Sequence, residues 1–186
     1  MRKLIATVFN YSIDGLVADE GTEFYQFCMG RPDDPADVEQ SLDFVRSAEV
    51  HIMGRVAYEG MAAAQQRVPD HPVHVILTAA PKIVFSRSLK AADWANTTIA
   101  AGDTAAEIDK LRHGGDGNIV VWGGRSFWRS LMRLDLLDEL HLDLFPCVAG
   151  EGTRLFEDVP KSYQLDLVSS TAWNNGTVAL HYRRHR

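Results

Sequence analysis

The sequence predicts a single α/β domain over residues 1–186, with a mostly parallel central sheet that ends in antiparallel C-terminal strands and is flanked by helices. Three observations predict this fold. Short apolar segments alternate with helix-like segments as far as about residue 134, which is typical of parallel strands joined by crossover helices. The remainder is mainly a run of strand-like segments, which favours antiparallel pairing. The length suits one sizeable core, and no linker or internal repeat divides the chain.

Strand and helix patterns follow one another along the first half of the chain. Residues 3–10 form an apolar run rich in strand-forming residues, and residues 15–35 form a polar segment that we interpret as a long loop. Pro35 is suited to the first turn of a helix, which we extend to about residue 48 because apolar side chains recur on one face. The next predicted elements are a strand at 50–53, a helix at 55–66, and strands at 73–78 and 82–85.

The second half begins with one more strand–helix–strand unit. Residues 97–100 are a short strand, and Asp103 or Thr104 caps a helix that ends near His113, before a glycine-rich stop. Residues 118–122 form a buried strand, and Gly123 and Gly124 open the next helix. The last predicted strands lie at 139–145, 163–169 and 177–182.

Composition excludes several classes of protein. A net charge of −6 argues against a general nucleic-acid surface, which needs an excess of basic residues. No apolar run reaches the roughly 18 residues of a membrane span. Cys28 and Cys147 lie far apart without metal-ligand spacing, so neither a disulfide framework nor a metal site is expected. We therefore expect a cytoplasmic protein with no nucleic-acid or membrane partner.

Glycines and arginines gather where predicted strands end. Gly54 and Arg55 follow one strand, Ser86 and Arg87 follow another, and residues 123–126 (GGRS) follow a third. Free N–H groups at a helix N-terminus suit a phosphate, glycine lets it approach the backbone, and a guanidinium matches its geometry. Each feature alone has an ordinary structural reading as a tight turn or a solvated arginine. Together they predict a pyrophosphate site at the carboxyl edge of the sheet.

Five segments resemble motifs of the dihydrofolate reductase superfamily, and they occur along the chain in the same order as in that superfamily. Residues 53–59 (MGRVAYE) are similar to its MGRxTYE segment, and residues 120–128 (VVWGGRSFW) to its strand–Gly-Gly–helix segment. Residues 12–18 (SIDGLVA) resemble the opening of its bacterial branch, which includes the reductase domain of the bifunctional riboflavin-pathway enzyme. Segments 82–89 and 138–156 fit the same branch. The resemblance covers nearly the whole chain and implies a dihydrofolate-reductase-like fold.

The resemblance also implies NADPH as the cofactor. The matching positions are Gly54, Arg55, Ser86, Arg87, Gly123, Gly124, Arg125 and Ser126. Gly54 and Arg55 match the adenosine-phosphate end of the cofactor. Ser86 and Arg87 match residues that flank its 2′-phosphate, and residues 123–126 match those that hold the pyrophosphate. In the family a cis peptide joins the two adjacent glycines. The deaminase motif of the bifunctional enzyme is missing, so the chain corresponds at most to a stand-alone reductase half.

Substrate residues follow from the same resemblance and from burial. Ile13 and Asp14 fall where the family's first loop approaches cofactor and substrate, and Trp128 takes the position of an aromatic residue near the nicotinamide. Asp143 lies inside an apolar strand, where a carboxylate is costly unless it is paired or functional, although the alternating pattern also allows it to face solvent. Candidates for the acid that grips a pterin, found in the first helix of dihydrofolate reductases, are Asp37, Glu39 and Asp43.

These observations predict an NADPH-dependent reductase that transfers a hydride to a small heterocyclic or carbonyl substrate, such as a pteridine or a pyrimidine of the riboflavin pathway. Asp14, Asp143 or an ordered water would deliver the proton. The alternative is a non-catalytic nucleotide-binding module of the same fold. We also expect a homodimer, because the family's bacterial branch usually pairs and the strand-rich C-terminal half leaves a sheet edge to cover.

Overall fold

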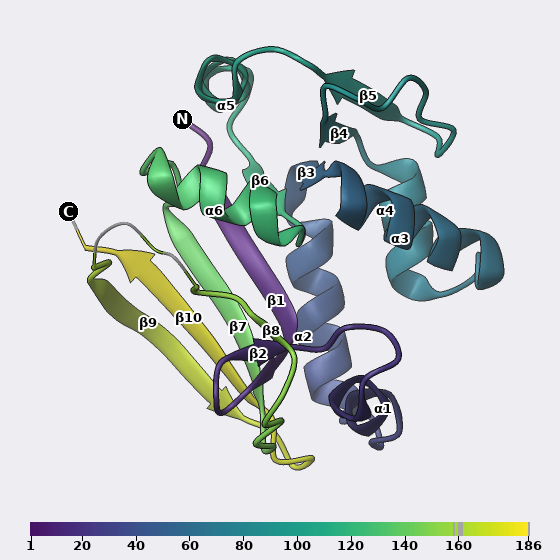
Figure 1. The fold of residues 1–186 in the computed structure, drawn as a ribbon, viewed down its shortest axis with the longest axis vertical. Helices are drawn as coiled ribbons and strands as arrows, with labels where there is room; N and C mark the ends of the chain where they lie inside the picture. The colour runs from purple at the N-terminus through teal and green to yellow at the C-terminus, as the bar shows by residue number, and fades with distance from the viewer. Residues whose placement is uncertain (158, 160–161, 186) are drawn as a thin grey trace.

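The computed structural model describes residues 1–157, 159 and 162–185, and its elements follow the order drawn in Figure 1. The strands are β1 (Leu4–Ser12), β2 (Leu16–Val17), β3 (Ala48–Gly54), β4 (Lys82–Phe85), β5 (Thr97–Ala100), β6 (Asn118–Val121), β7 (Glu139–Phe145), β8 (Thr153–Arg154), β9 (Leu165–Ala172) and β10 (Val178–Arg184). The helices are α1 (Glu23–Met29), α2 (Pro35–Arg46), α3 (Arg55–Arg67), α4 (Pro72–Ala79), α5 (Thr104–His113) and α6 (Arg125–Arg133).

One twisted sheet organises the domain. Its strand order is β5-β4-β3-β6-β1-β7-β10-β9, with β2 and β8 attached beside β1. All pairings from β5 to β7 in this order are parallel, whereas β10 runs antiparallel to both β7 and β9. The prediction of an α/β fold with a mostly parallel sheet and antiparallel C-terminal strands is confirmed.

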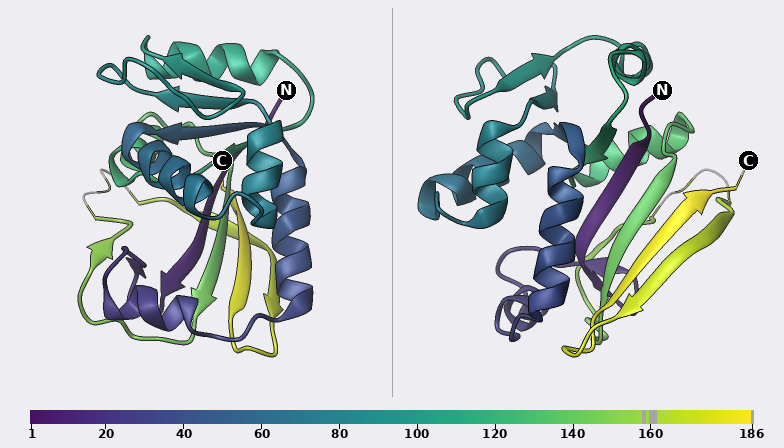
Figure 2. Two further views of the ribbon diagram at one scale, coloured as in Figure 1. Left: turned by 90° about the vertical axis from the view of Figure 1, so that its right-hand side faces the viewer. Right: turned by 180° about the vertical axis from the view of Figure 1, so that it is seen from behind.

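Helices cover both faces of the sheet, as the three views of Figures 1 and 2 show. α5 and α6 pack on one face, where Ile108 and Leu131 are fully buried against strand residues such as Ile52. α2, α3 and α4 pack on the other face, where Val45 and Leu77 are fully buried. Burial on both faces explains why the central strands are continuous apolar runs instead of alternating patterns.

The predicted strand at 73–78 is wrong, because these residues form α4. Pro72 lies in the first turn of this helix, where its missing N–H costs nothing. Ala80 is extended, with φ −81° and ψ 151°, as expected before Pro81, so the helix ends there. β3 pairs directly with β4 in parallel, and α3 and α4 together make the crossover between them. The β-branched residues of this segment favour a strand, but the packing of the segment in the folded protein favours the helix.

The predicted loop at 15–35 contains α1. Thr22 caps this helix, since its side-chain oxygen accepts the N–H of Tyr25 at 3.1 Å, and Glu23 lies in the first turn. Phe24 and Cys28 are buried one turn apart. The helix ends at Gly30.

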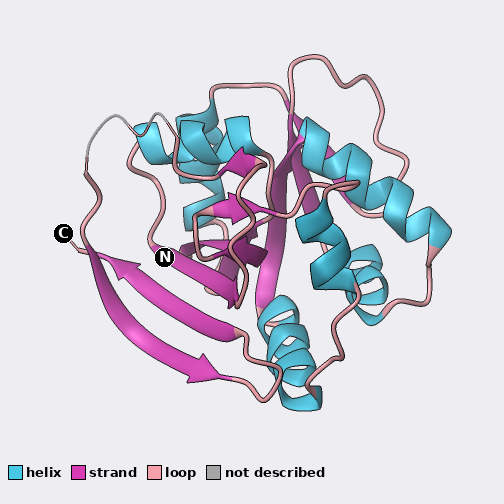
Figure 3. Cartoon of the chain, turned by 60° about the horizontal axis from the view of Figure 1, so that its bottom comes forward, coloured by secondary structure: helices cyan, strands magenta, loops and turns pink. Residues whose placement is uncertain are grey.

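The C-terminal hairpin of β10 and β9 extends the sheet beyond its helical cover, with β9 at the outer edge (Figure 3). At its tip, the backbone N–H of Asn174 donates to Asp34 at 2.8 Å, which attaches the hairpin to the start of α2. None of the helices in the described part of the chain is long and apolar enough to cross a membrane.

Candidate functional site

A cavity of about 400 Å³ lies where the parallel strands β3, β4, β5 and β6 end. Because parallel strands all point the same way, their carboxyl ends and the following turns meet at one edge of the sheet. The lining residues are Gly54, Arg55, Val56, Phe85, Ser86, Arg87, Ala100, Gly102, Thr104, Gly124, Arg125, Ser126 and Phe127. The structure therefore brings together all the predicted cofactor residues except Gly123, which directly precedes the lining residue Gly124.

Two helix N-termini open onto this cavity. α3 begins after Gly54 and α6 after Gly124, and neither N-cap carries a side chain that could bond the first N–H groups. Uncapped N–H groups, together with the partial positive charge of each helix end, form an environment that favours an anion. The α5 N-terminus at Thr104 lines the same cavity but is capped by Asp103.

Gly123 and Gly124 shape the turn in different ways. Gly124 has φ +100°, a conformation that side-chain-bearing residues rarely adopt. A Cβ at Gly123 would meet nothing within 4 Å, so the space beside this backbone is open to a ligand. The described residues contain no cis peptide bond, so the cis peptide expected between these glycines is not present. The positive φ of Gly124 accomplishes the change of chain direction here.

Gly54 holds the two helix starts close together. A Cβ at this position would lie 2.9 Å from the Cβ of Phe127 in α6, closer than side chains approach each other. The ring of Phe127 also stacks on Phe85, with centroids 4.8 Å apart. The glycine therefore lets the first turn of α6 pack directly on the end of β3.

Three arginines surround the cavity with positive charge. Arg55 pairs with Glu59 one turn later, at 2.8 Å, in a solvent-exposed bridge. Such exposed pairs contribute only a few tenths of a kcal/mol to folding stability. An anionic ligand can therefore replace Glu59 as the partner of the guanidinium with little loss of free energy. Arg87 and Arg125 are exposed at the rim. The chain has a net charge of −6, so these three arginines form a local region of positive charge on a negatively charged protein.

The hydroxyl of Ser86 is already partly engaged. Its oxygen accepts the backbone N–H of Leu89 at 2.9 Å and that of Ser88 at 3.2 Å. These bonds close a turn directly after β4, and this turn carries Arg87. The hydroxyl hydrogen of Ser86 remains available as a donor.

Asp14 fastens two loops together. Its two carboxylate oxygens accept the N–H groups of Ala149 and Gly150 at 2.9 and 2.8 Å. Hydrogen bonds from the Ser12 hydroxyl and from these two backbone groups lower the pKa of Asp14 to about 2. Next to it, Ile13 is 60% exposed, and its N–H donates to the carbonyl of Cys147 at 2.9 Å. The first loop is thus bonded to the segment after β7.

Replacing Asp14 by alanine is expected to lower the melting temperature at neutral pH, because two loop hydrogen bonds are lost. The carboxyl pKa is about 3.8 unfolded and about 2 folded, so this stabilisation is complete above pH 4 and is lost as the pH falls towards 2. Melting curves of both proteins from pH 5 to pH 2 should therefore converge. A constant difference over this range would contradict the assignment.

Asp143 points into a second cavity, of about 330 Å³, between α2 and the strands β1, β7, β10 and β9. Burial, and then the charge of Asp37, raise the pKa of Asp143 to about 7. Burial also raises the pKa of Asp37, whose carboxylate accepts a hydrogen bond from Asn175. Of the three candidate acids in the first long helix, Asp37 contributes to the raised pKa of Asp143, whereas Asp43 lines the cavity itself and pairs with Arg46.

Trp128 does not line either of these cavities. Its side chain is 1% exposed and belongs to the core under α6, beside a separate apolar cavity of about 520 Å³ with Met132 and Tyr163. The placement of Trp128 near a nicotinamide therefore stays a prediction. The helix rotates successive side chains by about 100°, and it is the preceding residue, Phe127, that lines the 400 Å³ cavity.

Known proteins of similar sequence and structure fit this geometry. The protein YyaP of Bacillus subtilis (strain 168), described as uncharacterized, is 27% identical over 176 residues, which cover 92% of this chain and 89% of that protein. A putative riboflavin biosynthesis protein from Shewanella sp. PV-4 has a similar structure, with a TM-score of 0.80, 21% identity and 99% of each chain covered. Dihydrofolate reductase from Enterococcus faecalis, complexed with NADP(H) and RAB-propyl, gives a TM-score of 0.62, 16% identity, and coverage of 98% of this chain and 97% of that one.

The family assignment rests on nearly the whole chain. Residues 2–179 match the RibD C-terminal domain, a range that includes β1, the whole parallel part of the sheet and every residue that lines the 400 Å³ cavity. The structural likeness to dihydrofolate reductase independently shows the fold. The chain therefore belongs to the RibD C-terminal domain family and has a dihydrofolate-reductase-like fold.

Proposed function

We propose that this protein is an NADPH-dependent reductase that transfers a hydride to a small heterocyclic or carbonyl substrate. The observation that carries the proposal is the cavity at the carboxyl ends of β3 to β6, where two uncapped helix N-termini and three arginines converge. Membership of the RibD C-terminal domain family supports it. NADPH, when bound, supplies the hydride.

The residues around the cavity divide between the parts of such a cofactor. The N–H groups at the start of α6, beside Gly123 and Gly124, suit the pyrophosphate. Arg87 and the donor hydroxyl of Ser86 suit the 2′-phosphate, and Arg55 suits the adenosine-phosphate end. Open space beside Gly123 gives the pyrophosphate direct access to the backbone.

Asp143 and Asp37 support a nitrogen heterocycle as substrate. The charge of Asp37 contributes to the raised pKa of Asp143, and both side chains lie at least partly buried. Two carboxyl groups in such a setting suit the N–H and amino donors of a pteridine or of a riboflavin-pathway pyrimidine. We assign Asp143 to substrate contact. Asp14, with a pKa of about 2, holds no proton near neutral pH, so we assign it to positioning the loop.

A titration followed by a turnover assay tests the proposal. NADPH is first titrated into the protein by calorimetry, and its oxidation is then followed with a panel of pteridines, ribosylated pyrimidines and small carbonyl compounds. Binding with oxidation in at least one case supports the reductase. Binding without oxidation across the panel favours the non-catalytic nucleotide-binding module. Absence of NADPH binding overturns both.

Replacing Asp143 by asparagine is expected to reduce turnover about ten- to hundredfold, because one charge-assisted hydrogen bond to the substrate contributes roughly 1.5–3 kcal/mol. The affinity for NADPH should change less than twofold, since Asp143 does not line the cofactor cavity. Steady-state kinetics and NADPH titration measure the two effects. A Glu39→Gln variant, which alters an exposed acid of α2 that does not line the cavity of Asp143, serves as the control. Unchanged turnover in Asp143→Asn would leave this acid a structural role.

We also propose that two copies associate through the β9 edge. β9 is the last strand of the sheet, and its apolar side chains are exposed: Leu165 by 39%, Leu167 by 56% and Val168 by 48%. An exposed apolar edge strand offers unpaired backbone groups and needs covering.

Light scattering over a wide concentration range is expected to give the mass of a dimer. Leu167→Lys should shift the protein towards the monomer, because a buried charge would oppose association. Val75→Lys, on the exposed face of α4, is the matched control and should leave the mass unchanged. A monomer mass for the wild-type protein at all concentrations would refute the proposal.

A further inference from the structure

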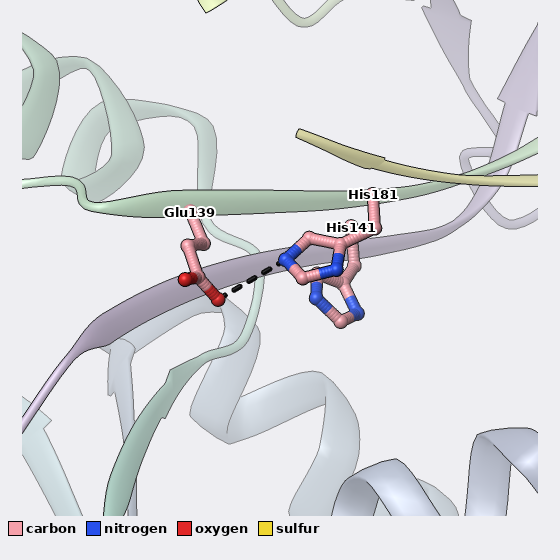
Figure 4. Close-up of side chains that lie close together, drawn as sticks. All are labelled: Glu139, His141 and His181. Carbon is pink, nitrogen blue, oxygen red and sulfur yellow. Dashed lines mark hydrogen bonds and ion pairs between the residues drawn. The ribbon is translucent and has the colours of Figure 1, made fainter. Parts of the chain in front are cut away.

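Three side chains with metal-binding groups lie on one face of the sheet, away from the cofactor cavity. His141 of β7 and His181 of β10 are direct cross-strand partners, and Glu139 lies two residues before His141 on the same face. Each offers one ligand atom, and these atoms lie within 4.8 Å of one another. Figure 4 shows the His181 ring directed at the Glu139 carboxylate, with the His141 ring beside it.

The cluster leaves one polar atom unsatisfied. Nε2 of His141 is buried and has no hydrogen-bond partner among the described residues. Burial of an unpaired polar group is unfavourable, and native structures rarely retain one without a ligand, a water or a functional reason.

Neighbouring side chains hold the other ligands in place. Nζ of Lys3 donates to Oε1 of Glu139 at 2.8 Å, which leaves Oε2 directed at His181, 3.1 Å away. The ring of Phe44 in α2 stacks on His141, with centroids 4.3 Å apart. Contacts of this kind orient ligands and are usual around metal sites.

We propose that Glu139, His141 and His181 bind one divalent transition-metal ion of the zinc class. Two imidazoles and one carboxylate are a frequent ligand set for Zn²⁺. His141 and His181 also line the 330 Å³ cavity beside α2, so a fourth coordination position can face that space. This cavity shares no lining residue with the cavity proposed for the cofactor. The proposed metal binding therefore does not depend on NADPH binding.

The distances require a modest adjustment on binding. Zn²⁺ bonds of about 2.0–2.2 Å place tetrahedral ligand atoms roughly 3.3–3.6 Å apart. The Glu139–His181 separation of 3.1 Å is close to this value, whereas the widest separation within the set must contract by roughly an ångström. Side-chain rotation of His141 or Glu139 is sufficient, because the two strands already hold the backbone in register.

The test uses the purified full-length protein after treatment with a chelator and dialysis. Zn²⁺ alone is titrated by calorimetry, and Co²⁺ alone is titrated to record the visible absorption of a tetrahedral site. We expect one ion per chain and a rise in melting temperature of about 5–10 °C at a hundredfold excess of free Zn²⁺ over Kd. His141→Ala, His181→Ala and Glu139→Gln should each weaken binding at least tenfold.

His71 and His74 supply the control, since their rings lie 5.1 Å apart at the start of α4, remote from the cluster in the fold. The double variant His71→Ala/His74→Ala should bind Zn²⁺ as the wild-type protein does. His141→Phe, which keeps an aromatic ring against Phe44, guards against unfolding and should also lose binding. Equal affinity in the wild-type, His141→Phe and His181→Ala proteins would overturn the proposal, as would loss of binding in the control alone.

Discussion

Replacing Gly123 by valine is expected to weaken NADPH binding by at least a hundredfold while the melting temperature changes by only a few degrees. A Cβ here would meet nothing within 4 Å, and the side chain would occupy the space proposed for the pyrophosphate. Loss of two charge-assisted hydrogen bonds to the phosphates, at roughly 1.5–3 kcal/mol each, accounts for this factor. Calorimetric titration and thermal unfolding of the same samples measure both quantities.

Variants at two other glycines distinguish an effect on NADPH binding from an effect on folding stability. Gly60 lies in α3, where an added Cβ also meets nothing, so Gly60→Ala should keep NADPH affinity and raise the unfolding free energy by about 0.5–1 kcal/mol. Gly124→Ala forces a side chain onto a residue with φ +100°, and we expect a loss of about 1–2 kcal/mol in unfolding free energy in addition to weaker binding. Normal NADPH affinity in Gly123→Val would show that the pyrophosphate lies elsewhere.

Wild-type protein is expected to bind NADPH about a hundredfold more tightly than NADH. The two cofactors differ by one 2′-phosphate, which a chain of net charge −6 repels unless local cations attract it. Arg55 and Arg87 both line the cavity, and two charge-assisted contacts of roughly 1.5–3 kcal/mol each would supply the preference. Titrations with both cofactors at two salt concentrations measure it, and the preference should shrink as salt rises.

Arg87→Ala is expected to lower the preference for NADPH about tenfold without changing NADH affinity by more than about twofold. Arg46→Ala is the matched control, because it removes the same charge from an exposed pair on α2. Arg55→Ala also frees Glu59, which adds a repulsive charge near the phosphate, so its effect should be at least as large. Equal affinity of the wild-type protein for NADPH and NADH would exclude this account.

Local patterns were sufficient to predict most of the parallel sheet. The strands beginning near Leu4, Ala48 and Asn118 are apolar runs with no helical periodicity, and the glycines that follow two of them mark the turns into α3 and α6. Residues 72–79 were misassigned because β-branched residues dominate a helix too short for a clear periodicity. The capping residue Thr22 and the stop at Gly30 were signals for α1 that a polar composition obscured.

Site residues were predictable where a motif is continuous in the chain. The cofactor residues lie in three short segments, each at a strand end, so sequence order alone predicts their meeting at one sheet edge. The pairing of His141 with His181 depends on the register of β7 and β10, which no local pattern reveals. Similarly, the positions of Asp37 and Asp43 relative to Asp143 became visible only when α2 was placed beside β7. Trp128 and Phe127 are adjacent in the sequence, and only the structure shows that Phe127 is the one that lines the 400 Å³ cavity.

The direct contact between Gly54 and Phe127 has a consequence for how a nucleotide is recognised. Because the end of β3 rests on the first turn of α6 with no intervening side chain, the spacing between the two helix starts is determined before any ligand arrives. Little conformational entropy is then lost when a ligand binds at these two helix starts. The protein and the ligand should therefore associate with only a small change in the protein backbone. Adaptation to different substrates would fall to the first loop, which hydrogen bonds from Asp14 tether to the segment after β7. Sequence differences among relatives are thus expected to concentrate in that loop, while the glycine junctions stay constant in length.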